Sequence, residues 1–174
     1  MRKDGKMNHL KLFRVTVMSA AILAAILSSA SNVSARKNGL GLGVIIGEPT
    51  GISFKVWSSN RTAVDGAVAW SLEGNDKMHL HADYLFHDYS VVSVDKGSMP
   101  FYYGIGGRIL VREGRNTDDK VGVRVPVGLS YLFANSPLEI FFEVVPILDL
   151  SPDTELDFNG GAGIRFYIGH KSGK

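Results

Sequence analysis

Apolar residues alternate with small or polar residues along most of the chain, and this pattern limits its fold more than any other feature. The clearest stretch places an apolar side chain at every second position from Val121 to Phe133. Successive side chains of a β-strand point to opposite faces of the sheet, so one face of such a strand is apolar and the other is polar. Seven further stretches of this kind are separated by clusters of turn-forming residues: 40–46, 52–57, 64–72, 78–87, 101–112, 138–149 and 158–168. The sequence therefore predicts an all-β fold of eight antiparallel strands.

The N-terminal residues form a separate segment. Five basic residues lie within residues 1–14, an uncharged apolar run of about 13 residues follows, and a Val-Ser-Ala triplet ends at Ala35. These three parts are typical of a secretory signal peptide, and the apolar run falls short of the roughly 20 residues of a membrane-spanning helix. An uncleaved anchor is the alternative. We expect a signal peptide at 1–35 and a mature domain at 36–174, whose formal net charge is −2 rather than the +2 of the whole chain.

Composition excludes several classes of protein. The 174 residues contain no cysteine, which excludes disulfides, thiolate metal sites and cysteine nucleophiles. Hydrophobic residues make up 45% of the chain, too large a share for a disordered protein. The basic excess lies in the predicted export signal, so the charge of the mature domain gives no indication of a nucleic-acid partner.

Glycine decides which face of the predicted barrel is inside. The interior of an eight-stranded barrel is only just wide enough for side chains, and the bulky apolar face would overfill it. A solvent-exposed sheet rarely uses many glycines, because glycine weakens a strand and packs nothing. Eight of the 20 glycines lie on the polar face: Gly41, Gly43, Gly104, Gly106, Gly122, Gly128, Gly161 and Gly163. We therefore expect an antiparallel up-and-down transmembrane β-barrel with a packed polar lumen and an apolar face toward lipid.

The polar face also carries equal numbers of basic and acidic residues. These ten residues are Lys55, Asp65, Asp83, Arg108, Arg112, Arg124, Glu139, Glu143, Asp149 and Arg165. An ionised side chain held away from water needs an opposite charge nearby. We expect an ion-pair network that fills the lumen, and this favours a closed barrel over a water-filled pore.

Two groups of polar residues suggest other chemistry. His79 and His81 share one strand face with Asp83, and two imidazoles spaced in this way could bind a zinc-class metal. Glu139 and Glu143 also share a face, and paired carboxylates could act as general acid and base. We expect instead that the histidines hydrogen-bond to lumen carboxylates and that the glutamates pair with arginines. On this interpretation the protein is not an enzyme and has no metal site and no cofactor.

Aromatic residues give the predicted barrel an orientation. If the mature N-terminus lies in the periplasm, seven aromatic side chains fall on the lipid face near the periplasmic rim: Tyr84, Phe86, Phe101, Tyr103, Tyr131, Phe133 and Phe166. Such a belt is typical of the interface between membrane and water.

The connections and the prolines add detail to this interpretation. The expected outer loops are short: 47–50, 73–77, 113–120 and 151–157. The connection 88–98 is long on the side where turns are usually brief. Pro126 and Pro146 lie within strand patterns, and because a missing N–H breaks a ladder bond, we expect bulges there.

Six segments together resemble a known family. They are GEPTGISFKVW (47–57), HLHADYLFH (79–87), FYYGIGGR (101–108), GVRVPVGLSYLF (122–133), FFEVVPILDL (141–150) and FNGGAGIRFYI (158–168). The mature chain is similar to the OmpA/OmpX-type small outer-membrane barrels, and more closely to a widespread, largely uncharacterised branch of them. The resemblance implies a monomeric, non-enzymatic protein of the bacterial outer membrane, with a structural or surface-interaction role and with membrane lipid and the barrel-insertion machinery as partners. The alternative is a soluble exported β-barrel that binds a small apolar ligand.

Overall fold

The structure is a computed structural model that describes residues 39–70, 77–112 and 119–168. Nine strands make up the described residues: β1 (Leu40–Glu48), β2 (Gly51–Trp57), β3 (Thr62–Trp70), β4 (Lys77–Asp88), β5 (Phe101–Arg112), β6 (Lys120–Arg124), β7 (Val127–Leu132), β8 (Leu138–Ser151) and β9 (Glu155–Ile168). Across these ranges, no helix is long and apolar enough to cross a membrane. The predicted signal peptide at 1–35 lies outside the described residues, as do parts of the predicted loops 73–77 and 113–120.

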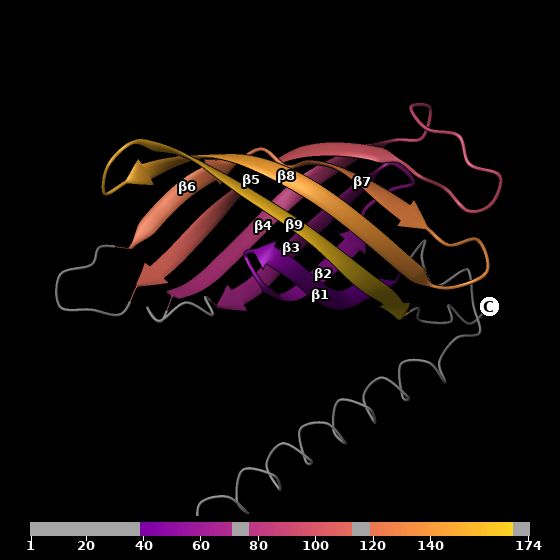
Figure 1. Ribbon diagram of the computed structural model, residues 1–174, viewed down its shortest axis with the longest axis horizontal. Coiled ribbons are helices and arrows are strands. Elements are labelled where there is room, and N and C mark those ends of the chain that lie inside the picture. The colour runs from indigo at the N-terminus through magenta and orange to yellow at the C-terminus, as the bar shows by residue number, and fades with distance from the viewer. Residues whose placement is uncertain (1–38, 71–76, 113–118, 169–174) are drawn as a thin grey trace, which may run out of the picture. The chain divides into compact units, whose positions relative to one another are not determined.

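The strands close into a ring. Each strand runs antiparallel to its neighbours, and the last strand, β9, pairs with β1 from Leu40↔Ile168 to Glu48↔Gly160. Figure 1 shows β9, in yellow, crossing the front of the barrel on its way back to β1. The predicted all-β antiparallel barrel is confirmed. We call the end where β1 begins and β9 ends the proximal end, and the opposite end the distal end.

Strands β6 and β7 together occupy one position in the ring, so nine segments fill eight positions. Both pair with β5 on one side and with β8 on the other, and Val125 and Pro126 separate them. The register is the same on both sides of Pro126, with Arg124↔Ile147 before it and Val127↔Val144 after it. The long sixth strand predicted from the alternation is thus a single strand position that one proline interrupts.

The predicted bulges at Pro126 and Pro146 are wrong. The Pro126 carbonyl accepts a hydrogen bond from the Gly104 N–H at 2.9 Å, and the Pro146 carbonyl accepts one from the Val125 N–H at 2.9 Å. Each proline therefore loses only the bond that its missing N–H would donate, and the strands keep their register. The register shift in this part of the sheet lies between Val121 and Gly122 instead.

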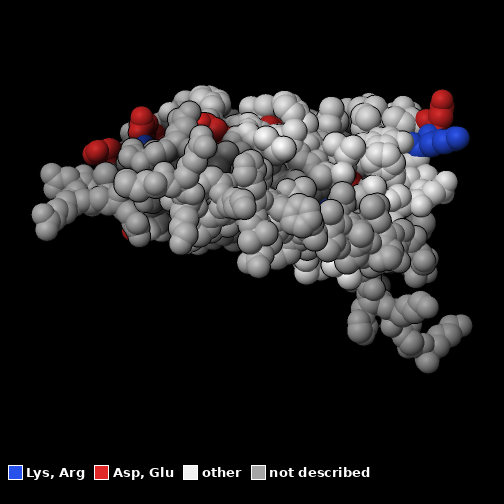
Figure 2. Space-filling model, turned by 60° about the horizontal axis from the view of Figure 1, so that its bottom comes forward, with Lys and Arg blue, Asp and Glu red and all other residues white. Residues whose placement is uncertain are grey.

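The outer face of the barrel is apolar. Large hydrophobic side chains stand exposed along every part of the ring, among them Ile105 at 58%, Phe142 at 57% and Phe158 at 59%. Charged side chains that stand out from the described surface lie toward its two ends (Figure 2). The inner face, in contrast, carries buried charges and small residues.

Glycine makes the inner face narrow enough to close. A Cβ added at any of the eight predicted lumen glycines would come within 3.0 Å of a neighbouring atom. Each of the four buried basic side chains also lies directly opposite one of these glycines on the adjacent strand: Lys55↔Gly41, Arg165↔Gly43, Arg124↔Gly106 and Arg108↔Gly122. The glycines therefore leave the space that these long side chains fill.

Replacing Gly163 with alanine should destabilise the barrel by about 1–3 kcal/mol, because the new methyl group would overlap the Phe141 ring and lie 2.5 Å from the Val44 carbonyl oxygen. Gly107→Ala is the matched control, since nothing lies closer than 3.7 Å to a Cβ at that outward position. Urea unfolding of the two variants in the same detergent measures the difference. Equal losses would contradict an interior that is full at Gly163.

Candidate functional site

The interior of the barrel collects the charged residues that the alternation placed on one face. Nine of the ten predicted lumen residues are no more than 3% exposed: Lys55, Asp65, Asp83, Arg108, Arg124, Glu139, Glu143, Asp149 and Arg165. Arg112 ends strand β5, and its side chain lies outside the described part of the chain. The nine side chains form three clusters along the barrel axis.

The proximal cluster joins β2, β3, β8 and β9. Lys55 Nζ lies 2.7 Å from Glu139 Oε1, and Arg165 Nη2 lies 2.8 Å from Asp65 Oδ2. Arg165 Nη1 also lies 3.7 Å from Glu139 Oε1, which links the two pairs. The Tyr167 hydroxyl donates to Glu139 Oε2. Two basic and two acidic side chains therefore balance here.

The middle cluster is built around Arg124 on β6. Its Nε lies 2.9 Å from Asp83 Oδ2 on β4, and its Nη2 donates to Glu143 Oε1 on β8 at 3.3 Å. The Tyr102 hydroxyl donates to the other oxygen of Glu143 at 3.0 Å. The Arg124 guanidinium is therefore the shared ion-pair partner of two buried carboxylates.

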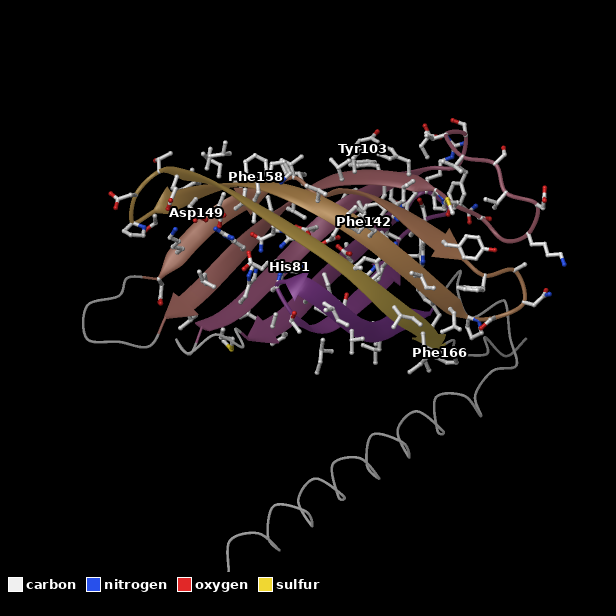
Figure 3. All side chains as sticks on the ribbon, viewed as in Figure 1. His81, Tyr103, Phe142, Asp149, Phe158 and Phe166 are labelled. Atoms are coloured by element: carbon white, nitrogen blue, oxygen red, sulfur yellow. The ribbon has the colours of Figure 1, made fainter. Side chains whose placement is uncertain are left out.

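The distal cluster is built around Arg108 on β5. Its Nε donates to Asp149 Oδ1 at 2.9 Å and its Nη2 to Asp149 Oδ2 at 2.6 Å, which is a bidentate pair. Nη2 also donates to Asp157 Oδ2 at 2.7 Å, and Nη1 donates to Asn159 Oδ1 at 3.1 Å. Figure 3 shows Asp149, a residue of β8, toward this end of the barrel.

Several members of the distal cluster do not follow from the sequence analysis. Lys120 Nζ lies 2.7 Å from Glu155 Oε2 and 3.3 Å from Asp149 Oδ2. We expected loops at 113–120 and 151–157, whereas β6 begins at Lys120 and β9 at Glu155. The alternation of apolar residues fades at these strand ends, so the sequence carries little signal for the longer strands.

Buried apolar side chains lie beside the charged clusters. One buried group contains Ile45, Ala67, Leu85, Tyr102 and Phe141, and a second contains Trp57, Ala63, Leu132 and Tyr167. The Arg165 guanidinium carbon lies 3.8 Å from the centroid of the Phe141 ring, and Lys55 Nζ lies 4.6 Å from that of Trp57. These cation–π contacts stabilise the charges without further carboxylates.

One of the buried histidines of β4, His87, differs from expectation. Lys55 Nζ lies 2.9 Å from His87 Nε2, so His87 bonds to a lysine rather than to a carboxylate. His79 Nε2 and His81 Nδ1 have no hydrogen-bond partner among the described residues, and the two rings meet edge to face with centroids 5.4 Å apart. Within the described ranges, no group of three or more His, Asp or Glu residues is placed to hold a metal ion.

Glu139 and Glu143 do not act as a pair. Glu139 belongs to the proximal cluster with Lys55, whereas Glu143 belongs to the middle cluster with Arg124. Each carboxylate is held by a buried base and by a tyrosine hydroxyl. Each glutamate is therefore the ion-pair partner of a base on another strand, which is a structural role.

Comparison with known proteins places the chain by family and by fold. The family model described as "Protein of unknown function (DUF3996)" matches residues 31–171. The N-terminal β-barrel domain of Pseudomonas aeruginosa OprF is structurally similar, with a TM-score of 0.53 and 10% sequence identity, over 75% of this chain and 96% of that domain. At this identity the similarity concerns the fold. No curated protein matches the chain.

Replacing Lys55 with methionine should lower the free energy of unfolding by about 3–5 kcal/mol, because Glu139 loses its nearest positive charge while it stays buried. Lys120→Met is the matched control and should cost about 0–1 kcal/mol, since its partner Glu155 is largely solvated and Asp149 keeps Arg108. Urea titrations of both variants in lipid vesicles measure the two losses. A Lys120 variant as unstable as the Lys55 variant would contradict the ranking by burial.

Proposed function

Because the chain belongs to the DUF3996 family and shares the fold of the OprF β-barrel domain, we propose that it is a non-enzymatic β-barrel protein of a bacterial outer membrane. The exposed apolar outer face is the observation that carries this proposal. Soluble monomers rarely expose continuous apolar patches of more than a few hundred Å². A band of exposed Leu, Ile, Val and Phe around a closed barrel matches the surface that membrane barrels turn toward lipid.

Aromatic side chains support the orientation of the barrel in the membrane. Phe86 stacks on Tyr103 with ring centroids 5.7 Å apart and meets Tyr84 edge to face at 5.2 Å. Tyr131 and Phe133 form a second edge-to-face pair at 4.8 Å. These residues line the proximal half of the outer face, which favours that end as the periplasmic one.

Phe166 does not belong to this belt. It was expected on the lipid face near the rim, but it is only 7% exposed. Its place near the proximal end of β9 is visible in Figure 3. Phe166 therefore contributes little surface to the outer face.

The closed interior favours a structural or surface-interaction role over conduction. Ion pairs and apolar groups fill the described lumen from the Tyr167 hydroxyl at the proximal end to Arg108 at the distal end. The distal end would then face the outside, and its loops are where a surface ligand would bind. We propose membrane lipid and the barrel-insertion machinery as partners, and a monomeric state.

A soluble barrel that binds an apolar ligand lacks support from the interior. Such a barrel would need an apolar cavity, whereas the described interior is lined with buried charges. The proposed location also depends on the predicted export signal at residues 1–35, which lies outside the described residues.

Labelling of single cysteines tests the facing, because the chain contains no native cysteine. Spin labels at Ile105→Cys and Val144→Cys should be relaxed strongly by oxygen, which concentrates in lipid, and weakly by a water-soluble nickel reagent. A label at Asn60→Cys, in the exposed turn after β2, is the control and should show the opposite order. Preferential access of the nickel reagent at Ile105 and Val144 would rule out lipid contact.

Fractionation tests the location. Carbonate should leave the protein in the membrane pellet, detergent should release it, and an unheated sample should migrate faster on gels than a boiled one. A closed barrel satisfies all its backbone groups internally and stays compact until it is heated, which explains the shift. Release by carbonate or equal mobility of the two samples would refute the proposal.

A further inference from the structure

The buried charges inside the barrel do not balance. Among the described side chains, four buried bases face five buried acids: Lys55, Arg108, Arg124 and Arg165 against Asp65, Asp83, Glu139, Glu143 and Asp149. The proximal cluster balances two against two, and Asp149 has a bidentate partner in Arg108. The surplus acid therefore lies in the middle cluster, where Arg124 alone faces two carboxylates. An unpaired buried charge is strongly unfavourable.

Two unpartnered oxygen atoms lie at the same level of the barrel. Asp65 and Asp83 are directly opposite each other on β3 and β4, and both point inward. Oδ1 of each residue has no hydrogen-bond partner among the described residues. Like charges directly opposite each other on neighbouring strands destabilise a sheet. Two ionised carboxylates therefore do not fit this position.

The other acid of the middle cluster has donors for both of its oxygens. Glu143 Oε1 accepts from Arg124 and Oε2 accepts from Tyr102. Asp83 has fewer hydrogen-bond donors, because Arg124 Nε lies 2.9 Å from its Oδ2 but is not aligned for a hydrogen bond. Asp83 is therefore the acid that carries the surplus charge.

We propose that Asp83 binds a proton at neutral pH, held on Oδ1. A single proton on Asp83 removes the surplus charge of the middle cluster and leaves Glu143 as the ionised partner of Arg124. Two carboxylates that share one site commonly hold one proton between them. The middle of the barrel is thus a proton-binding site.

Groups from every side of the ring surround this site. The charged and titratable side chains that face it are Lys55 on β2, His81 on β4, Tyr102 on β5, Arg124 on β6, Glu143 on β8 and Arg165 on β9. Gly106 opposite Asp83 leaves the space in which the carboxyl lies.

The site couples the closed barrel to pH. The folded protein keeps a proton that an aspartate in the unfolded chain releases above about pH 4. Folding therefore takes up a proton, and the free energy of unfolding falls as the pH rises until Asp83 ionises in the folded barrel. Release of the proton leaves two acids against one arginine at the middle of the lumen.

Infrared spectroscopy of the refolded full-length protein in lipid vesicles tests the proposal directly. At neutral pH the wild type should show the carbonyl band of a protonated carboxyl group, shifted in heavy water. The band should be lost in Asp83→Asn and kept in Asp149→Asn, the matched control from the distal cluster. A wild-type spectrum without this band at neutral pH would overturn the proposal, whether or not the variants fold.

Stability provides a second test. Asparagine is uncharged and has nearly the same shape as a protonated aspartate, so Asp83→Asn should unfold at the same urea concentration as the wild type at neutral pH. Asp65→Asn should unfold earlier, because Arg165 loses its ionised partner. Equal destabilisation of the two variants would mean that Asp83 is an ionised partner of Arg124. A midpoint that rises when sodium replaces a large organic cation at fixed ionic strength would assign the site to a metal cation instead, and would equally overturn the proposal.

Discussion

The width of an eight-position barrel is the constraint on which the rest of this structure depends. Neighbouring strands lie close together around a narrow interior, so each long inward base needs free space on at least one side. The sequence meets this demand by setting glycine opposite each buried base, as Gly41 is opposite Lys55 and Gly106 is opposite Arg124. Each glycine–base pair therefore determines both where a long side chain fits and where a positive charge lies in the interior.

The narrow interior also explains why every buried base is paired with a carboxylate. Little room remains for water to solvate a buried ion, so each base must be met by carboxylates from other strands. Arg108 reaches β8 and β9, and Arg124 reaches β4 and β8. The Arg108 contacts and the Arg124–Asp83 pair connect strands that share no backbone hydrogen bonds, whereas β6 and β8 are also paired in the sheet. The barrel is therefore braced through its interior as well as around its wall.

Much of this arrangement follows from the amino-acid sequence, because a two-residue period fixes which side chains share a face. The ten charged residues and the eight glycines could be assigned to one face in this way. The partners could not, because they depend on how far each strand is displaced along its neighbour. Glu139 and Glu143 are four residues apart on one face, yet they belong to different clusters. Strand ends such as Lys120 escaped notice because their contacts are ionic rather than apolar.

The ion pairs of the proximal cluster bear on how the chain reaches this state. Lys55 and Glu139 are 84 residues apart in the sequence, and Asp65 and Arg165 are 100 residues apart. Neither pair can form until β8 and β9 have been made and brought back to the first strands. Contacts of such long range slow folding, because the chain loses the conformational entropy of loop closure before the contact contributes any stabilising free energy. Hairpins that form early must therefore keep their charged faces in water. The interior loses its water only in the last step, when β9 pairs with β1 and closes the barrel.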